Sequence, residues 1–157
     1  MSKLPHRTGP GRTYFVSSAT WERRELFRVP STAELLVARI VACRERGAYL
    51  LHEFVVMPNH FHLLVTPGET TSLEKAVQLV KGGFSFEFQK QSGNRMEIWQ
   101  VGFHDWTVRD PEDYFAKVRY IHLNPVLKRL VERPEEWAHG SACGQFAMDP
   151  APAKFKS

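Results

Sequence analysis

Cysteine is scarce in this sequence, with only Cys43 and Cys143 among 157 residues. The two lie far apart along the chain, which excludes a disulfide framework and the paired spacing of a zinc site. Apolar runs are short, since none approaches the roughly 18 to 20 residues that a membrane helix requires. The first eleven residues are polar and lack the apolar stretch of a signal peptide. We therefore expect a cytoplasmic protein without a membrane partner, whose cysteines are reduced and structural.

Acidic side chains are outnumbered, because 21 Lys and Arg face 17 Asp and Glu and give a formal charge of +4. A basic balance favours polyanionic partners, although many small basic proteins bind no nucleic acid. Hydrophobic residues make up 43% of the chain and charged residues 24%, which is ordinary for a globular protein. No internal repeat divides the sequence, so we expect one domain over residues 1–157, with loose ends at about 1–11 and 148–157.

Strand-like and helix-like segments alternate between those ends. Runs rich in β-branched and aromatic residues predict strands, and capping residues followed by helical spacing predict helices. We expect strands over residues 12–20, 49–57 and 60–67 and one or two within 98–109, and helices over 30–46, 71–91 and 110–124. The order β-α-β-β-α-β-α matches the split βαβ pattern of a ferredoxin-like antiparallel sheet, with an additional C-terminal helix. The expected fold class is therefore α+β.

Polar residues are predicted to cap these helices. Ser31 with Glu34, and Thr71 with Glu74, have the spacing of a capping box. Asp110 precedes a proline and further acids, which is typical of a helix start.

Turn and helix-breaking residues mark the remaining connections. Pro58-Asn59 is expected to form a hairpin turn between two strands. Gly82-Gly83 predicts a kink in the second helix, because each glycine costs roughly 1 kcal/mol relative to alanine. Pro125 is expected to kink or end the third helix.

Two histidines on one strand are the first indication of chemistry. Alternate side chains of a strand share a face, so we expect His60 and His62 to point one way and Phe61 and Leu63 into the core. Two imidazoles on one face form half of a metal site, although a solvated strand face has the same pattern. Zinc is not specifically indicated, because no Cys pair and no second His pair has zinc-site spacing. A histidine-triad nucleotide site would need a third histidine where Leu64 stands.

Helical periodicity places Tyr120 on a mostly polar side of the third helix. Lys117 and Asn124 share that side, whereas Val118 and Ile121 lie toward the other. Tyr120 and Asn124 are four residues apart and are therefore neighbours on the helix surface. A phenol can attack phosphorus, and the amide oxygen of Asn124 suits a hard cation. By itself, the pattern fits an ordinary surface or half-buried tyrosine better.

Four segments in order resemble one known family. Residues 57–62 are similar to the HUH motif of transposases, and residues 98–105 and 120–126 resemble further hallmarks of the REP-associated tyrosine transposases. Residues 81–85 also have a counterpart in that family. The similarity extends over roughly residues 14–141. Each segment is modest alone, and their combination and order make the resemblance strong.

The resemblance implies a ferredoxin-like sheet with helices, an activity and a set of site residues. His60 and His62 would be metal ligands, Asn124 takes the place of the third ligand, and the metal would be Mg²⁺ or Mn²⁺. Tyr120 stands in the family's nucleophile position. The implied activity is cleavage of single-stranded DNA near hairpins, such as repetitive extragenic palindromes, through a 5′-phosphotyrosine, followed by rejoining. The protein would be nucleoid-associated and act as a monomer or a homodimer.

The sequence also departs from the family pattern. After residue 126 the family commonly has a basic residue, a small residue and a glycine, whereas this chain has Leu127, Lys128 and Arg129. Residues 137–141 are a loose version of the family's Trp-then-serines ending. These differences concern DNA sequence preference and tail packing, and they leave the implied chemistry intact.

Other residues are expected to support the chemistry or to contact DNA. Arg12 and Lys81 are the candidate phosphate contacts, because they lie near the family-like segments. Aromatic residues in the range 99–106 could stack on unpaired bases, although core packing is favoured for them. His104 and His122 are candidates for assisting the phenol, with packing or DNA contact as the favoured role for each.

Three alternative functions remain open from the sequence. The first is a non-catalytic protein that binds structured DNA, which the intact set of His60, His62, Tyr120 and Asn124 disfavours. The second is a metal-dependent phosphodiesterase that uses water as the nucleophile. The third is a small-molecule enzyme with an imidazole pair, which the basic charge and the motif order disfavour.

Overall fold

The computed structural model describes residues 11–156. Its strands and helices follow the expected order β-α-β-β-α-β-α, which confirms the prediction. They are β1 (Thr13–Ala19), α1 (Pro30–Glu45), β2 (Tyr49–Met57), β3 (His60–Pro67), α2 (Leu73–Ser92), β4 (His104–Val108) and α3 (Pro111–Leu127). Short 3-10 turns, Trp21–Arg23 and Leu26–Arg28, occupy the charged connection before α1. Within the described residues, no helix is long and apolar enough to cross a membrane.

The four strands form one antiparallel sheet in the order β2-β3-β1-β4, so the α+β, ferredoxin-like class is confirmed. β2 and β3 form the expected hairpin, whose turn is Pro58-Asn59. In the register of the sheet, Ser17 lies opposite His62 on β3 and opposite His104 on β4. Directly opposite residues point to the same face. The two histidines therefore belong to one row across the sheet.

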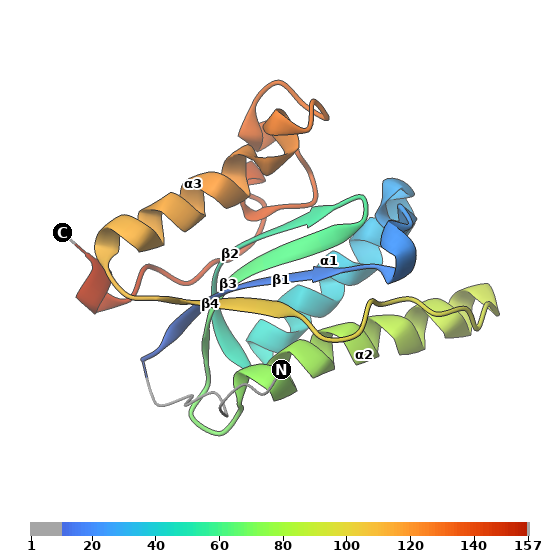
Figure 1. The fold of residues 1–157 in the computed structure, drawn as a ribbon, viewed down its shortest axis with the longest axis horizontal. Coiled ribbons are helices and arrows are strands. Elements are labelled where there is room, and N and C mark those ends of the chain that lie inside the picture. The colour runs from blue at the N-terminus through green and yellow to red at the C-terminus, as the bar shows by residue number, and fades with distance from the viewer. Residues whose placement is uncertain (1–10, 157) are drawn as a thin grey trace.

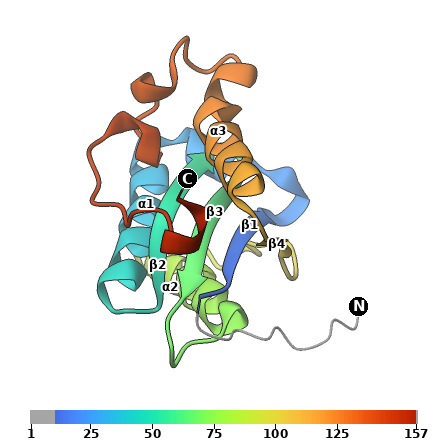
Figure 2. The same ribbon diagram turned by 90° about the vertical axis from the view of Figure 1, so that its left-hand side faces the viewer.

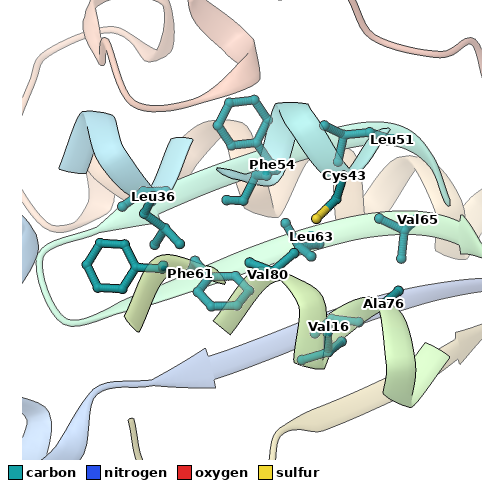
Figure 3. Packing of buried hydrophobic residues seen from close by; sticks show 14 of the residues in the cluster. Val16, Leu36, Cys43, Leu51, Phe54, Phe61, Leu63, Val65, Ala76 and Val80 are labelled. Atoms are coloured by element: carbon teal, nitrogen blue, oxygen red, sulfur yellow. The ribbon is translucent and has the colours of Figure 1, made fainter. Parts of the chain in front are cut away.

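Helices cover both faces of the sheet. α1 and α2 pack on one face, and α3 crosses the other (Figures 1 and 2). The larger core lies between the sheet and the first two helices, and it contains Phe61, Leu63 and Val65 (Figure 3). A smaller core lies under α3 and includes Leu64 and Ile121. Alternation along β3 thus divides its side chains between the two cores.

Helix starts follow the sequence prediction only in part. Asp110 caps α3, because its Oδ1 accepts a hydrogen bond of 2.7 Å from the Asp113 amide. The two predicted capping boxes are wrong. α1 begins at Pro30 without a side-chain cap, and α2 is capped by Ser72, which accepts from the Lys75 amide at 3.0 Å.

The predicted interruptions of the helices are milder than expected. α2 runs unbroken through Gly82 and Gly83. α3 continues past Pro125 to Leu127, and the Lys128 amide still donates to the Asn124 carbonyl at 3.1 Å. Three further residues of helix therefore follow Asn124 before the chain turns.

The C-terminal segment, predicted to be loose from about residue 148, is anchored to the domain, which corrects that prediction. The carboxylate of Asp149 accepts from Arg44 at 2.9 Å and from the Leu51 amide at 2.8 Å. Phe155 is buried and stacks on Tyr114 of α3, with ring centroids 5.4 Å apart. The predicted loose N-terminal end lies outside the described residues, apart from Gly11.

Candidate metal and tyrosine site

The histidine pair lies on the face of the sheet that α3 covers. His60 and His62 point to this face, and Phe61 between them lies in the opposite core, as the alternation predicted. The two imidazole centroids are 4.9 Å apart, with the rings inclined by 76°. The strand therefore brings two side-chain nitrogen donors close together.

Burial keeps both imidazoles neutral. His62 is only 5% exposed, and neither ring nitrogen has a hydrogen-bond partner. Burial, and then the proximity of His60, lowers the pKa of His62 to about 3. Burial, and then the charges of Arg23 and Lys128, lowers the pKa of His60 to about 4. Neutral imidazoles offer the lone pairs that a metal requires.

A neighbouring amide orients His60. Its Nδ1 lies 2.7 Å from Oδ1 of Asn59, which can only accept, so Nδ1 carries the proton. The Nε2 lone pair of His60 is then the one that remains for a ligand. Such an outer partner is typical of metal-binding histidines.

α3 places Tyr120 directly beside this pair. The Tyr120 ring meets His62 edge-on at 5.3 Å between centroids and meets Phe15 at 5.9 Å. Phe15 in turn stacks on His62 at 5.0 Å. Tyr120 keeps 45% of its surface exposed. The structure therefore combines a solvent-accessible phenol with a buried imidazole.

Asn124, one helical turn after Tyr120, is buried against the sheet. It is 3% exposed, and its Oδ1 has no hydrogen-bond partner. Helical spacing grouped Asn124 with the mostly polar side of α3, and the structure shows that this position is buried. Within residues 11–156, no group of three His, Cys, Asp or Glu side chains is placed to hold a metal ion. The amide oxygen of Asn124 is a donor outside those residue types that could serve as a third protein ligand.

The unpaired atoms fit a cation. Leaving a buried polar atom without a partner costs about 1 to 3 kcal/mol. In the described part of the chain, the buried side-chain nitrogen and oxygen atoms in that state are Nδ1 and Nε2 of His62 and Oδ1 of Asn124. Nitrogen and amide-oxygen donors with no partner in the protein are what a divalent cation would satisfy.

An aromatic and basic group borders the site, and it includes Trp106, one of the aromatics for which the sequence favoured core packing over base stacking. Lys117 lies 4.6 Å from the Trp106 ring centroid and 5.7 Å from that of Phe15. Asp113 fixes this group, since it accepts from Lys117 Nζ and Trp106 Nε1, each at 3.0 Å. Trp106 is 56% exposed. Alternation in β4, which puts Trp106 on the face of His104, was the signal available in the sequence.

The two predicted DNA contacts lie away from the pair. Lys81 on α2 donates to the carbonyls of Gly102 at 2.7 Å and Gln100 at 3.3 Å, so it holds the loop before β4. Burial lowers the pKa of Lys81 to about 8. Arg12 is exposed just before β1. It precedes Ser17, the partner of His62, by five residues, or roughly 16 Å along a strand.

The two other candidate histidines occupy different positions. His104 is exposed on β4, in the same row of the sheet as His62. His122 is half-buried, and its Nε2 lies 2.7 Å from Oε1 of Glu53 on β2. Ser141 donates to the same carboxylate oxygen at 2.6 Å. His122 thus contacts the edge strand β2, whereas Tyr120 contacts Phe15 on β1 and His62 on β3.

Comparison with known proteins identifies the class of this chain. The profile of the family described as "Transposase IS200 like" matches residues 13–124, from the first residue of β1 to Asn124. The match covers well over half of the sequence. The chain belongs to the IS200-like transposase family.

Individual relatives are distant but similar over most of their length. The chain is 23% identical to the REP-associated tyrosine transposase of Escherichia coli K12, over 80% of this chain and 78% of that protein. It is 25% identical to a putative REP-associated tyrosine transposase of Haemophilus influenzae, over 83% of this chain and 80% of that protein.

Solved structures confirm the fold. A REP-associated tyrosine transposase bound to a REP hairpin superposes with a TM-score of 0.73 at 23% identity, covering 100% of this chain and 94% of that chain. A putative transposase from Deinococcus radiodurans R1 gives a TM-score of 0.56 at 19% identity, covering 79% and 97%.

Proposed function

We propose that this protein is a metal-dependent endonuclease and strand transferase that acts on single-stranded DNA through Tyr120. The observation that carries the proposal is the contact between Tyr120 and His62. A half-exposed phenol lies 5.3 Å, ring to ring, from a buried imidazole whose nitrogens have no partner. Core tyrosines such as Tyr49, whose hydroxyl donates to the Ile40 carbonyl at 2.7 Å, are satisfied within the protein.

Three side chains would hold the cation: His60, His62 and Asn124. The amide oxygen suits a hard cation such as Mg²⁺ or Mn²⁺, and the two imidazoles favour Mn²⁺ of the pair. A bound cation would neutralise charge on the phosphate oxygens. Two observations support this assignment, because Asn59 orients the His60 ring at 2.7 Å and His62 is buried in the sheet.

Tyr120 would supply the nucleophile. Its phenolic oxygen forms a bond to phosphorus while the bond from phosphorus to the 3′ oxygen breaks, which leaves a 5′-phosphotyrosine and a free 3′-hydroxyl. The phenol proton is lost and the leaving oxygen gains one. Because the phosphotyrosine conserves a phosphoester bond, a 3′-hydroxyl can attack it later and rejoin DNA without an external energy source.

The DNA partner would be a single strand with a hairpin. The relative of known structure is bound to a REP hairpin, and the present chain shares its fold. A net charge of +4 favours phosphate binding. Trp106 and Lys117 offer an exposed ring and a cation beside Tyr120, which suits an unpaired base and its phosphate. The packing of α3 on its own sheet supports a site in which Tyr120 would act with the histidines of the same chain.

The experiment mixes the protein with labelled hairpin DNA in Mn²⁺ or EDTA and separates the products on a denaturing gel. We expect a metal-dependent covalent adduct that disappears in Tyr120→Phe. Tyr114→Phe is the matched control, because it removes a phenol from the buried side of the same helix. It should keep the adduct.

Other results would support the alternatives. Cleavage that survives Tyr120→Phe and gives no adduct would identify a phosphodiesterase that uses water. Binding of several hairpins without cleavage would identify a non-catalytic protein that binds structured DNA.

A further inference from the structure

A polar cavity of about 270 Å³ opens beside His60, at the Lys128 end of α3. Its polar lining consists of Arg23, Glu25, Arg28, Asn59, His60 and Lys128. The cavity is several times larger than the roughly 30 Å³ that one water molecule occupies in the liquid. It is therefore large enough for a polyatomic ligand. We call it the His60 cavity.

The charges in the His60 cavity do not cancel. Arg28 is paired, because its Nε lies 2.8 Å from Oε1 of Glu25. Within the described residues, Arg23 and Lys128 have no carboxylate partner. Two unpaired cations outweigh the partial negative charge of about one half at the end of α3. The cavity is thus suited to an anion.

Arg23 is held in place by an unusual turn. Glu22 and Arg23 both have left-handed backbone conformations, with φ of 54° and 56°. Such a conformation costs a non-glycine residue about 1 kcal/mol or more, so other contacts must maintain it. Asn59 supplies them, since its Nδ2 donates to the Arg23 carbonyl at 3.4 Å and its own carbonyl accepts from the Thr20 amide at 3.0 Å.

Asn59 therefore connects the cavity to the candidate metal site. One side-chain atom of Asn59 contacts the turn of Arg23, and the other contacts the His60 ring at 2.7 Å. Lys128 also lines the cavity, and it follows Asn124 by one helical turn. Each cation is thus coupled to a proposed metal ligand, so an anion in the cavity would lie next to the phosphate that Tyr120 attacks.

We propose that the His60 cavity binds a backbone phosphate of the single-stranded DNA, adjacent to the phosphate that is cut, through Arg23 and Lys128. This inference rests on the proposed function. Arg23 and Lys128 would fix the register of the DNA strand relative to Tyr120. Phosphate contacts position a nucleic acid and carry no sequence information themselves.

The test is a charge-removal cycle that measures binding in the Tyr120→Phe background. Neutral methylphosphonate linkages replace one phosphate at a time along the single-stranded flank of a labelled hairpin. Arg23→Gln/Lys128→Gln removes the cavity's charge, and Lys90→Gln/Arg95→Gln removes equal charge from exposed positions near the distal end of α2. Coupling is the part of the combined loss that is not additive.

We expect one position in the flank to show coupling. There, the methylphosphonate should weaken binding to the unaltered cavity about tenfold, a typical cost for a lost charge-assisted contact. Arg23→Gln/Lys128→Gln should weaken binding similarly, and the two changes together no further. Lys90→Gln/Arg95→Gln should give additive losses at every position.

Additive losses at every position for Arg23→Gln/Lys128→Gln would overturn the inference, while an adduct formed by the wild type would leave the proposed function standing. Coupling without any adduct would support the cavity and contradict the cleavage chemistry. Free phosphate is the other source of the same chemistry. If inorganic phosphate binds the wild type and not Arg23→Gln/Lys128→Gln, and no DNA position is coupled, the cavity binds a free anion and the DNA assignment is wrong.

Discussion

The Nε2 atom of His122 lies 2.7 Å from Oε1 of Glu53, so one hydrogen bond ties the helix of Tyr120 to strand β2. The same oxygen accepts from Ser141 at 2.6 Å, and Ser141 Oγ also accepts from the Phe54 amide at 2.9 Å. This network joins α3, β2 and the C-terminal segment. It bears on Tyr120 because His122 is two residues away on the same helix.

Replacing His122 with alanine should loosen this attachment. Glu53 would lose one of its two donors, and we expect the free energy of unfolding to fall by about 1 to 2 kcal/mol. Adduct formation should become slower but should not vanish, because Tyr120 and the metal ligands remain. Urea unfolding and single-turnover gels measure the two effects. The same loss of stability in His104→Ala, which alters an exposed histidine, would contradict the role of the network.

The His62 side chain should destabilise the fold when no metal is bound and stabilise it when a metal is bound. In EDTA, His62→Leu removes two buried nitrogens that have no partner. It should therefore unfold at the same or a higher denaturant concentration than the wild type. With Mn²⁺ at 100 times its dissociation constant, the wild type should gain about 2.7 kcal/mol. His62→Leu should gain nothing.

The control for that measurement is His139→Leu, which alters a half-buried histidine in the C-terminal segment. This variant should keep the full response to Mn²⁺. If EDTA and Mn²⁺ give the same unfolding midpoint for the wild type at every metal concentration, the assignment of His62 as a ligand is wrong.

Local patterns predicted the parts of the site that depend on a single element. Alternation along β3 put His60 and His62 on one face and Phe61 on the other, because a strand has only two faces. The start of α3 followed from Asp110 and the proline after it, since a cap acts within one turn. These features require no knowledge of what packs against the element.

Features that depend on packing could not be predicted in this way. Helical spacing grouped Asn124 with the polar side of α3, but only docking on the sheet shows that this side is partly buried. Lys81 was predicted to contact DNA because it is basic and lies near a family-like segment. In the structure it donates instead to two carbonyls of the loop before β4. Asp149 was expected to lie in a loose end, but its contacts with Arg44 and Leu51 anchor it to the domain.

A buried histidine outside the site should make the fold sensitive to acid. Burial lowers the pKa of His52, against the opposing effect of its carbonyl acceptors. Its Nδ1 lies 2.9 Å from the Pro150 carbonyl, and its Nε2 lies 2.8 Å from Thr66 Oγ1. Nδ1 therefore donates to the carbonyl, and neutral Nε2 accepts from the hydroxyl.

Because the folded pKa of His52 is below the unfolded value of about 6.5, the unfolded chain binds more protons as the pH falls below that value. The contribution of His52 is fully present above the unfolded pKa and declines below it, by up to about 1.4 kcal/mol per pH unit. Urea unfolding in EDTA between pH 7 and pH 5 measures the slope. The free energy of unfolding of His52→Phe should depend less steeply on pH than that of the wild type. An unchanged slope would mean that other groups cause the acid sensitivity.

Two adjacent glycines of α2 should respond differently to replacement by alanine. A Cβ at Gly82 would meet nothing within 4 Å, so Gly82→Ala should stabilise the helix by up to about 1 kcal/mol. A Cβ at Gly83 would collide with the guanidinium group of Arg39, whose Nε donates to the Leu79 carbonyl at 3.1 Å. That bond links α1 to α2, and Gly83→Ala would displace it.

The loss of the Arg39 bond should offset the helix-propensity gain at Gly83, because each is worth about 1 kcal/mol. Gly83→Ala should therefore be neutral or destabilising, whereas Gly83→Ala in an Arg39→Ala background should recover the full gain seen at Gly82. Urea unfolding of the wild type, Gly83→Ala, Arg39→Ala and the double variant completes the cycle. Equal stabilisation by Gly82→Ala and Gly83→Ala in the wild-type background would mean that Arg39 moves aside freely and contributes nothing to the contact between α1 and α2.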